Sequence, residues 1–404
     1  MIRILVTCVA IYLAAAGNIY AADNYLLGDW AELRPAMEQK GITAEAVLTT
    51  DFLYNSRGGI KEDGTILGNV DLTFKLDTAK AGWWKNGTFF LYFLGNFNSG
   101  RAMTENVGDV QASSNIEADR AFKIYEAWYE HRFLNDQLSL LAGLHDYNSE
   151  FDVVEYGALF INSSFGISPD ISQTGPSIFP TTSLGLRLKT QPSEKSYLLV
   201  AVYDGVPGDS GDPPRTSIIL KEKDGVFTAF EVGLSAGQPG EKEYYKLGAG
   251  AWLHTADVEN FDGDPKGTNH GYYIIAEKTL FTESSSGQGL GAFVQVGWAD
   301  NEWNQIANYW GIGLNYTGLI PGRDSDRIGL AVASARNGDK FMDFKKNIEF
   351  VPVDHTETAI ELTYRAELRP WLSIQPDFQY IINPGMNQSL KNAFQIGSRV
   401  EISF

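Results

Sequence analysis

The sequence predicts an all-β protein: a transmembrane antiparallel β-barrel of about 16 strands with a short N-terminal amphipathic helix. Three observations predict this fold. The chain ends on a long two-faced strand, short alternating segments recur along its length, and an export signal precedes a chain without further cysteine. Together they favour a closed sheet embedded in lipid, because lipid tolerates no unpaired backbone groups.

Residues 391–404 alternate between apolar and polar side chains. The apolar positions from Phe394 onward are Phe394, Ile396, Val400, Ile402 and Phe404, interrupted by Ser398. A period of two places alternate side chains on opposite faces of a strand. Chain ends usually fray unless they are tied down, whereas a membrane barrel must pair its last strand with its first. We therefore interpret 391–404 as the closing strand, with Arg399 and Glu401 facing the lumen near its periplasmic end.

The N-terminus has the pattern of a secretory signal peptide over residues 1–22. A positive charge in Met1–Arg3 precedes an apolar run, Ile4–Ala16, and small residues lead to a cleavage site near Ala21 or Ala22. This run is shorter than the roughly 20 residues of a spanning helix. The single cysteine, Cys8, lies inside the signal, so the exported chain is expected to be stable without disulfides.

The composition favours one large β-structure over several soluble domains. The chain has 41 glycines and 13% aromatic residues, and no linker or low-complexity tract divides it. A formal net charge of −18 argues against a nucleic-acid partner, which would require basic patches.

The N-terminal periplasmic segment, residues 23–42, differs from the rest. Apolar residues in Tyr25–Gly41 recur at helical spacing, and Gly41 ends the pattern. Two positions for this helix are open: the periplasmic mouth of a pore, or a packing site on the barrel rim.

The barrel is predicted over residues 43–404, in segments of the roughly 9–11 residues that a tilted membrane strand requires. The predicted strands are 43–54, 67–77, 87–97, 121–131, 137–146, 181–190, 196–205, 226–235, 244–255, 271–281, 288–299, 307–318, 326–336, 355–369, 371–382 and 392–404. Their connections broadly alternate between long loops (98–120, 147–180, 206–225, 337–354) and short turns (132–136, 191–195, Pro370). Long external loops and short periplasmic turns are typical of such barrels, and the even strand number places both chain ends in the periplasm. The pattern is weakest over 267–307.

Aromatic residues near strand ends are expected to form an interfacial girdle. These residues are Trp298, Tyr364, Trp371 and Tyr380; ordinary core packing is the alternative.

If the apolar alternates face lipid, their polar neighbours line the lumen. Sixteen strands enclose too wide a space for side chains to fill, so an aqueous channel is expected. The predicted channel-lining residues on the strands are Asp71, Lys75, Glu126, Trp128, Glu130, Arg187, Lys189, Glu361, Arg365 and Asp377.

Residues 147–180 are too long and too apolar for a surface loop. An apolar loop must bury itself, and in a wide barrel the lumen offers the space. We expect this loop to fold inward and constrict the channel; a lid packed on the rim is the alternative. The candidate constriction residues are Asn148, Glu150, Asn162, Phe165 and Phe179.

Sequence motifs for chemistry are weak. Gly208–Gly211 matches a protease nucleophile loop, but Asp212-Pro213 follows it and no histidine has a matching context. A barrel lipid hydrolase would need serine and histidine side chains brought together from separate segments. The acidic loop containing Asp257, Glu259, Asp262 and Asp264 lacks the spacing of a dedicated calcium loop, so we expect solvated carboxylates, no cofactor and no resident metal.

Short motifs along the whole exported chain resemble the carbohydrate-selective porins of Gram-negative outer membranes (the OprB type). They are Leu26-Leu27-Gly28-Asp29-Trp30 with Leu33-Arg34, Tyr125-Glu126-Ala127-Trp128, Asn148-Ser149-Glu150-Phe151, Asn162-Ser163-Ser164-Phe165-Gly166, Gly175-Pro176-Ser177-Ile178-Phe179-Pro180, Tyr203-Asp204-Gly205-Val206-Pro207-Gly208, Pro370-Trp371, Gln375-Pro376-Asp377 and Asn383-Pro384-Gly385. Ala31-Glu32 departs from the small glycines that the family usually has after Asp-Trp.

The resemblance implies a sixteen-stranded outer-membrane porin through which glucose and related sugars diffuse. It also implies contact with outer-membrane lipid and lipopolysaccharide, and assembly by the barrel-assembly machinery with Phe404 as a signal; monomer and homotrimer stay open. Sugar hydroxyls suit carboxylates, and sugar CH faces suit aromatic rings, so Glu126, Trp128 and Glu130 are candidates for sugar contact. A network that only braces the wall is the alternative for these three. A general or cation-leaning porin, and a barrel lipid hydrolase, are the competing functions.

Overall fold

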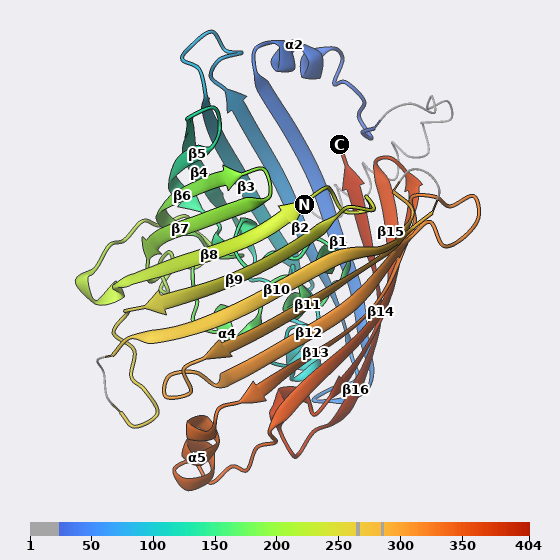
Figure 1. Ribbon diagram of the computed structural model, residues 1–404. Coiled ribbons are helices and arrows are strands. Elements are labelled where there is room, and N and C mark those ends of the chain that lie inside the picture. Colours follow the sequence, from blue (N-terminus) through green and yellow to red (C-terminus); the bar gives the residue numbers. More distant parts are fainter. Residues whose placement is uncertain (1–23, 264–266, 284–286) are drawn as a thin grey trace.

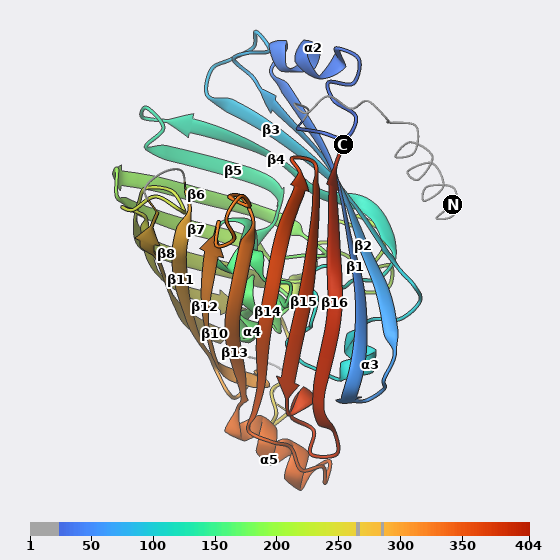
Figure 2. The same cartoon turned by 90° about the vertical axis from the view of Figure 1, so that its right-hand side faces the viewer.

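The computed structural model describes residues 24–263, 267–283 and 287–404. The predicted signal peptide and Cys8 lie outside the described residues. Sixteen antiparallel strands form one closed barrel, as predicted, in which each strand pairs with its sequence neighbours and β1 pairs with β16 (Figures 1 and 2). The strands are β1 (Ile42–Gly59), β2 (Gly64–Asp77), β3 (Gly87–Asn98), β4 (Ala121–Phe133), β5 (Leu138–His145), β6 (Ser183–Ser193), β7 (Ser196–Asp204), β8 (Val226–Ala236), β9 (Tyr245–His254), β10 (Asn269–Thr282), β11 (Gly289–Ala299), β12 (Ile306–Thr317), β13 (Arg327–Asn337), β14 (Thr356–Arg369), β15 (Leu372–Ile382) and β16 (Lys391–Ser403).

The strand boundaries agree closely with the period-two pattern. The largest difference is at β1, which continues to Gly59 rather than ending at residue 54. The 267–307 region, where the sequence pattern is weakest, forms the strands β10 and β11 and the start of β12, with a register shift between Thr279 and Phe281 of β10. Outward side chains such as Val232 and Leu330 are almost half exposed, at 47% and 49%. The inward side chain of Glu231, the residue before Val232, is fully buried. An apolar face therefore surrounds the barrel, and the inward face carries the buried polar side chains, together with apolar ones on β7 to β13.

The four described α-helices are short. They are α2 (Leu33–Gln39), α3 (Thr104–Val107), α4 (Pro169–Ser172) and α5 (Asp339–Asn347). No helix in the described part of the chain is both long enough and apolar enough to cross a membrane.

The N-terminal helix is shorter than the predicted 25–41 segment. Trp30, Ala31 and Glu32 have positive φ values of 56°, 56° and 69°, a left-handed conformation that prevents an α-helix from starting before Leu33. Arg34 of α2 donates to the carbonyls of Ala44 and Phe404, at 2.8 and 2.7 Å. The helix therefore packs on the barrel rim, beside the C-terminus (Figure 1).

The expected aromatic girdle is present in part. Trp298 and Tyr380 face outward and are 42% and 40% exposed, and Tyr364 is half-buried. Trp371 is only 7% exposed, so its assignment to the girdle is wrong. It lies in the tight turn between β14 and β15, where its carbonyl accepts a hydrogen bond from the Ser403 amide.

Candidate functional site

The loop between β5 and β6, residues 146–182, lies against the inward face of the barrel; we call it the constriction loop. Its apolar side chains Phe151, Phe160 and Phe165 are essentially fully buried. They belong to one cluster with inward-facing side chains of β7 to β13, among them Phe227 and Phe293. Burying these apolar side chains against the wall supplies the main favourable term for holding the loop inside the barrel.

Three carboxylates on the barrel wall hold the backbone of this loop. Glu231 accepts the Asp152 amide at 3.0 Å. Glu277 accepts the Glu155 and Tyr156 amides at 3.1 and 3.0 Å. Glu361 accepts the Ile161 and Asn162 amides at 2.7 and 2.9 Å. We call Glu231, Glu277 and Glu361 the wall clamps, because irregular backbone inside a barrel must find hydrogen-bond partners.

A second loop, residues 99–120 between β3 and β4, also lies inside the barrel, which the sequence did not predict. The backbone amides of Val110 and Gln111 donate to Oε2 and Oε1 of Glu357, each at 3.0 Å. Ser114 Oγ donates to Asp51 at 2.7 Å. This loop has few apolar residues, so no burial signal appears in its sequence; it is held by these hydrogen bonds and by Met103 and Val107, which are buried against the wall.

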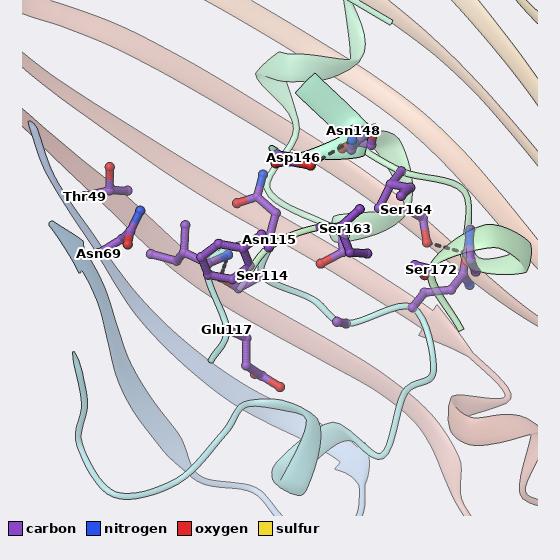
Figure 3. Close-up of a pocket in the computed structure, with 18 of the residues that line it drawn as sticks. Thr49, Asn69, Ser114, Asn115, Glu117, Asp146, Asn148, Ser163, Ser164 and Ser172 are labelled. Carbon is purple, nitrogen blue, oxygen red and sulfur yellow. Dashed lines mark hydrogen bonds between the residues drawn. The ribbon is translucent and has the colours of Figure 1, made fainter. Parts of the chain in front are cut away.

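A cavity of about 580 Å³ lies between the two loops and the wall formed by β1, β2 and β16. The side chains labelled around it in Figure 3 are all polar. The lining includes Thr49, Asn69, Asp71 and Arg399 from the strands, Ser114, Asn115 and Glu117 from the second loop, and Asp146, Asn148, Ser163, Ile178 and Phe179 from the constriction loop. Its volume falls within the roughly 300–1,000 Å³ of small-molecule sites.

Arg399 contributes the positive charge of this cavity. Its guanidinium binds Asp51 through two hydrogen bonds, at 2.7 and 2.8 Å, and donates to Asn115 Oδ1 at 2.7 Å. These contacts place Arg399 at the level of the inward loops rather than at the periplasmic mouth expected for it. Asp71 accepts hydrogen bonds from Tyr92 and Asn69, at 2.5 and 2.8 Å, through the same oxygen Oδ1. Its other oxygen therefore remains available to an incoming hydroxyl.

The predicted trio on β4 shares one face through the ordinary alternation of a strand, and a β-bulge at Tyr125 turns that residue inward beside Glu126. Glu126 accepts Trp128 Nε1 at 3.0 Å and the Asp146 amide at 3.2 Å. Glu130 accepts Arg187 Nη2 at 2.9 Å. Both carboxylates thus have protein donors, as the bracing alternative requires.

Arg187 is the centre of a buried charge network below the constriction loop. It contacts Glu130 and Glu150, the latter at 2.5 Å, and Lys189 lies 3.5 Å from Glu150. Arg187 is only 2% exposed, so this network fixes the start of the loop to β4 and β6.

Several predicted site residues do not reach the channel. Glu361 and Asp377 are fully buried beneath the constriction loop, as are Asn162 and Phe165 within it. Their assignment as channel-lining or constriction residues is therefore corrected: Glu361 holds the loop backbone, Asn162 donates to Gln379 on β15, and Phe165 packs in the apolar cluster. Asp377 accepts a hydrogen bond from Gln379. Arg365 pairs with Glu401 at 2.6 Å, while Lys75 is exposed.

Carboxylates of the loops titrate unusually because of their surroundings. Burial raises the pKa of Asp146 to about 6, although hydrogen bonds from Tyr125, Asn148 and Ser149 oppose the shift. Burial likewise raises the pKa of Asp152 to about 7, against the hydrogen bonds from Ser168. Near neutral pH these loop carboxyls are partly protonated, which lowers the negative charge inside the barrel.

Among the described residues, one hydrogen bond joins a serine and a histidine side chain, between Ser149 Oγ and His145 Nε2 at 3.2 Å. The hydroxyl of Ser149 donates to the Asp146 carbonyl at 2.6 Å, so its proton is directed away from the imidazole. This geometry does not provide the serine and base of a hydrolase.

The acidic loop contains no assembled metal site in its described part. Among the residues that the structure describes, no three His, Asp or Glu side chains come together as metal ligands. Asp262 instead pairs with Lys340 at 2.6 Å, and Asp264 lies outside the described residues.

Comparison with known proteins gives consistent matches over almost the whole chain. The family model described as carbohydrate-selective porin, OprB family, matches residues 61–404. Porin B of Pseudomonas aeruginosa is 23% identical over 428 residues, which cover 95% of this chain and 92% of that protein. The putative porin QuiX of Acinetobacter baylyi is 22% identical and covers 96% of this chain and 95% of its own.

Solved structures show the same fold. The high-pH structure of Pseudomonas putida OprB superposes with a TM-score of 0.85 at 20% identity, covering 96% of this chain and 100% of that chain. The low-pH structure of Pseudomonas putida OprB gives a TM-score of 0.62 at 18% identity with the same coverage.

Proposed function

Since this chain belongs to the OprB family of carbohydrate-selective porins and is an outer-membrane sugar porin, we propose that its selective element is the polar cavity between the two inward loops. Glucose and related monosaccharides would cross it by passive diffusion. The observation that carries this proposal is the lining of the cavity, where carboxylates, amides and hydroxyls meet one guanidinium at the level of both loops.

The chemistry of the lining suits a neutral polyhydroxy solute. Each sugar hydroxyl both donates and accepts a hydrogen bond. Asp71 and Asn115 offer acceptors, and Arg399 offers donors, around one space. A solute with few hydroxyls would leave these groups poorly solvated in the narrow passage, which raises its barrier.

The contacts must also be weak, because a channel conducts only when its solute leaves as readily as it enters. The lining groups already have protein partners: Arg399 binds Asp51, and Asp71 binds Tyr92. A passing sugar therefore meets groups whose hydrogen-bonding capacity is already partly used by the protein, which keeps each binding step shallow.

Export and membrane placement complete the proposal. The protein is a Gram-negative outer-membrane protein, and we propose cleavage of its signal near Ala21 or Ala22 before assembly by the barrel machinery among lipid and lipopolysaccharide. Mass spectrometry of the purified protein would report the mature N-terminus. A chain that retains residue 1 would contradict the cleavage.

Liposome swelling tests the function. Glucose entry is compared with that of tetraethylene glycol, an uncharged ether of similar size, in wild type and in Asp71→Asn. We expect glucose to enter faster in wild type, and the ratio to fall about threefold in the variant, the effect of one weakened hydrogen bond. Asp136→Asn, in an exposed turn outside the cavity, serves as the matched control. Equal entry of both solutes in wild type would defeat the sugar preference.

A cation-leaning general porin is the second candidate. The cavity contains the carboxyl groups of Asp71, Glu117 and Asp146 against one arginine, and the chain carries a net charge of −18. Reversal potentials in a planar bilayer under a KCl gradient, before and after Glu117→Gln, measure the preference. A cation preference without any glucose preference would favour this candidate over the sugar channel.

A further inference from the structure

Inward aromatic rings form a connected series along β3, β4 and the end of the constriction loop. Phe90 and Trp128 stack with centroids 4.9 Å apart and planes at 26°. Phe90 also meets Tyr92 edge-on at 6.4 Å, and Tyr92 meets Tyr125 at 5.0 Å. Tyr125 contacts Phe179 at 6.4 Å. We call these five residues the aromatic column.

The strand alternation turns these rings toward the lumen. Phe90 and Tyr92 alternate with Phe89 and Phe93 on β3, and the latter two meet Trp84 and Phe122 in a separate set of ring contacts. The pairing of Phe90 with Trp128 and of Tyr92 with Glu126 places the members of both strands side by side. Trp128 lies three residues beyond Tyr125 on β4, so the column extends about 10 Å along the strand at roughly 3.3 Å per residue.

Four of the five rings keep accessible surface. Phe90, Tyr92, Trp128 and Phe179 are half-buried, whereas Tyr125 is only 3% exposed and supports its neighbours from behind. A ring that served only as core would be covered on all sides, as Phe227 and Phe293 are under the constriction loop. The half-buried rings therefore leave apolar surface next to a channel that is otherwise polar.

The polar edges of the column are already satisfied. Tyr92 Oη donates to Asp71, Tyr125 Oη donates to Asp146, and Trp128 Nε1 donates to Glu126, at 2.5, 2.5 and 3.0 Å. What each ring has left to offer a solute is its apolar surface. Asp71, Asp146 and Phe179 also line the cavity, so the column starts at the cavity and continues past it along β4.

We propose that the aromatic column is a stacking surface for pyranose rings, which makes the channel discriminate cyclic sugars from open-chain polyols of the same size. The proposal rests on the sugar-channel function and names its specificity-determining residues. A pyranose presents a flat CH face that lies on an aromatic ring while its hydroxyls reach Asp71 and Asn115. Sorbitol has the same kinds of hydroxyl but must order its flexible chain to present such a face.

The test compares the swelling rates of liposomes with glucose and with sorbitol, using tetraethylene glycol as the reference solute. Wild type is expected to admit glucose faster than sorbitol. Phe90→Leu and Phe179→Leu should each lower the glucose-to-sorbitol ratio about threefold, because leucine keeps the apolar volume but has no ring face. Phe90→Tyr, which keeps the ring, should restore the ratio.

Phe93→Leu is the matched control, since it removes a neighbouring ring of the same strand that is turned away from the column. Heat-dependent gel mobility and KCl conductance verify that each variant forms channels. Phe179 lies in a loop, so its variant leaves the strands intact even if Phe90→Leu disturbs folding.

The outcomes separate the two proposals. If folded Phe90→Leu and Phe179→Leu channels keep the wild-type glucose-to-sorbitol entry ratio, the proposed stacking role of the aromatic column is overturned. Equal entry of glucose and sorbitol into wild type, with both faster than the ether, overturns the column and supports the polar cavity. Equal entry of all three solutes overturns the sugar preference itself.

Discussion

The guanidinium of Arg399 binds the carboxylate of Asp51 across the line where the last strand meets the first. Asp51 is fully buried and also accepts Ser114 Oγ, while Arg399 donates to Asn115 of the same loop. One ion pair therefore couples the closure of the barrel to the position of the 99–120 loop.

Arg399→Gln should destabilise the barrel and widen the channel. Removing one partner of a buried pair costs about 3–5 kcal/mol, because Asp51 is left with an uncompensated charge. The unfolding midpoint in urea and the single-channel conductance measure the two effects. Arg215→Gln, whose side chain is 80% exposed in the 205–225 loop, should change neither. An unchanged midpoint for Arg399→Gln would contradict the role of the pair.

Glu361→Gln should loosen the constriction loop. The carboxylate accepts two amides, from Ile161 and Asn162, and the amide side chain of glutamine offers only one acceptor oxygen. We expect higher conductance and a lower glucose-to-ether entry ratio. Glu243→Gln, at an exposed turn, is the control, and identical behaviour of the two variants would show that the wall clamp does not hold the loop.

The position of the constriction loop should depend on pH through Asp152. Burial raises the pKa of this carboxyl from 3.8 to about 7; hydrogen bonds from Ser168 oppose the shift, Glu231 adds to it and Lys246 opposes it. Because the pKa is higher in the docked loop than in an undocked one, docking takes up a proton. Docking is therefore strongest below about pH 4 and weakens as the pH rises through about 7.

Conductance measured between about pH 5 and pH 8 should rise with pH in wild type and rise less in Asp152→Asn, which has no proton to lose at this position. A residual rise is expected from Asp146 and Asp109, because the pKa of each is raised to about 6. If conductance rises equally with pH in wild type and in Asp152→Asn, Asp152 is not the group that causes the pH dependence.

Arg187→Gln should make the channel more cation-selective. The change removes the partner that Glu130 and Glu150 share and leaves them the longer ion pairs with Arg132 and Lys189, at 3.7 and 3.5 Å. The reversal potential under a KCl gradient should shift toward the equilibrium potential of K⁺. The double variant Arg187→Gln with Glu150→Gln removes one of the two carboxylates that lose Arg187, so it should reverse part of this shift. An unchanged reversal potential in Arg187→Gln would mean that the network is screened from the permeating ions.

The strands were predictable because the residue pattern of each strand depends on the surroundings of its own two faces. Lipid on one side and water or polar groups on the other impose a period of two, so Val70 to Asp77 and Phe394 to Phe404 reveal their faces without knowledge of their neighbours. The inward position of the constriction loop also carried a local signal, the excess of apolar residues around Phe160.

The cavity was only partly predictable, because it is formed by residues brought together from distant segments. Asn115 and Glu117 lie in a polar loop whose inward fold depends on acceptors such as Glu357 and Asp51, far away in the sequence. The bulge that turns Tyr125 inward has no signature in an alternating pattern. Alternation also cannot tell whether an inward residue such as Glu361 meets water or lies beneath a loop.

The pairing of β1 with β16 has a consequence for how the molecule is made. Every other strand pair joins consecutive strands, so each can form within its own hairpin. Only the final pair must wait for Phe404, and until then two unpaired edges persist at opposite ends of a growing sheet. Arg34, which bonds the carbonyls of both Ala44 and Phe404, can make its full set of contacts only after this last step. The N-terminal helix can therefore reach its final packed position only on a closed barrel.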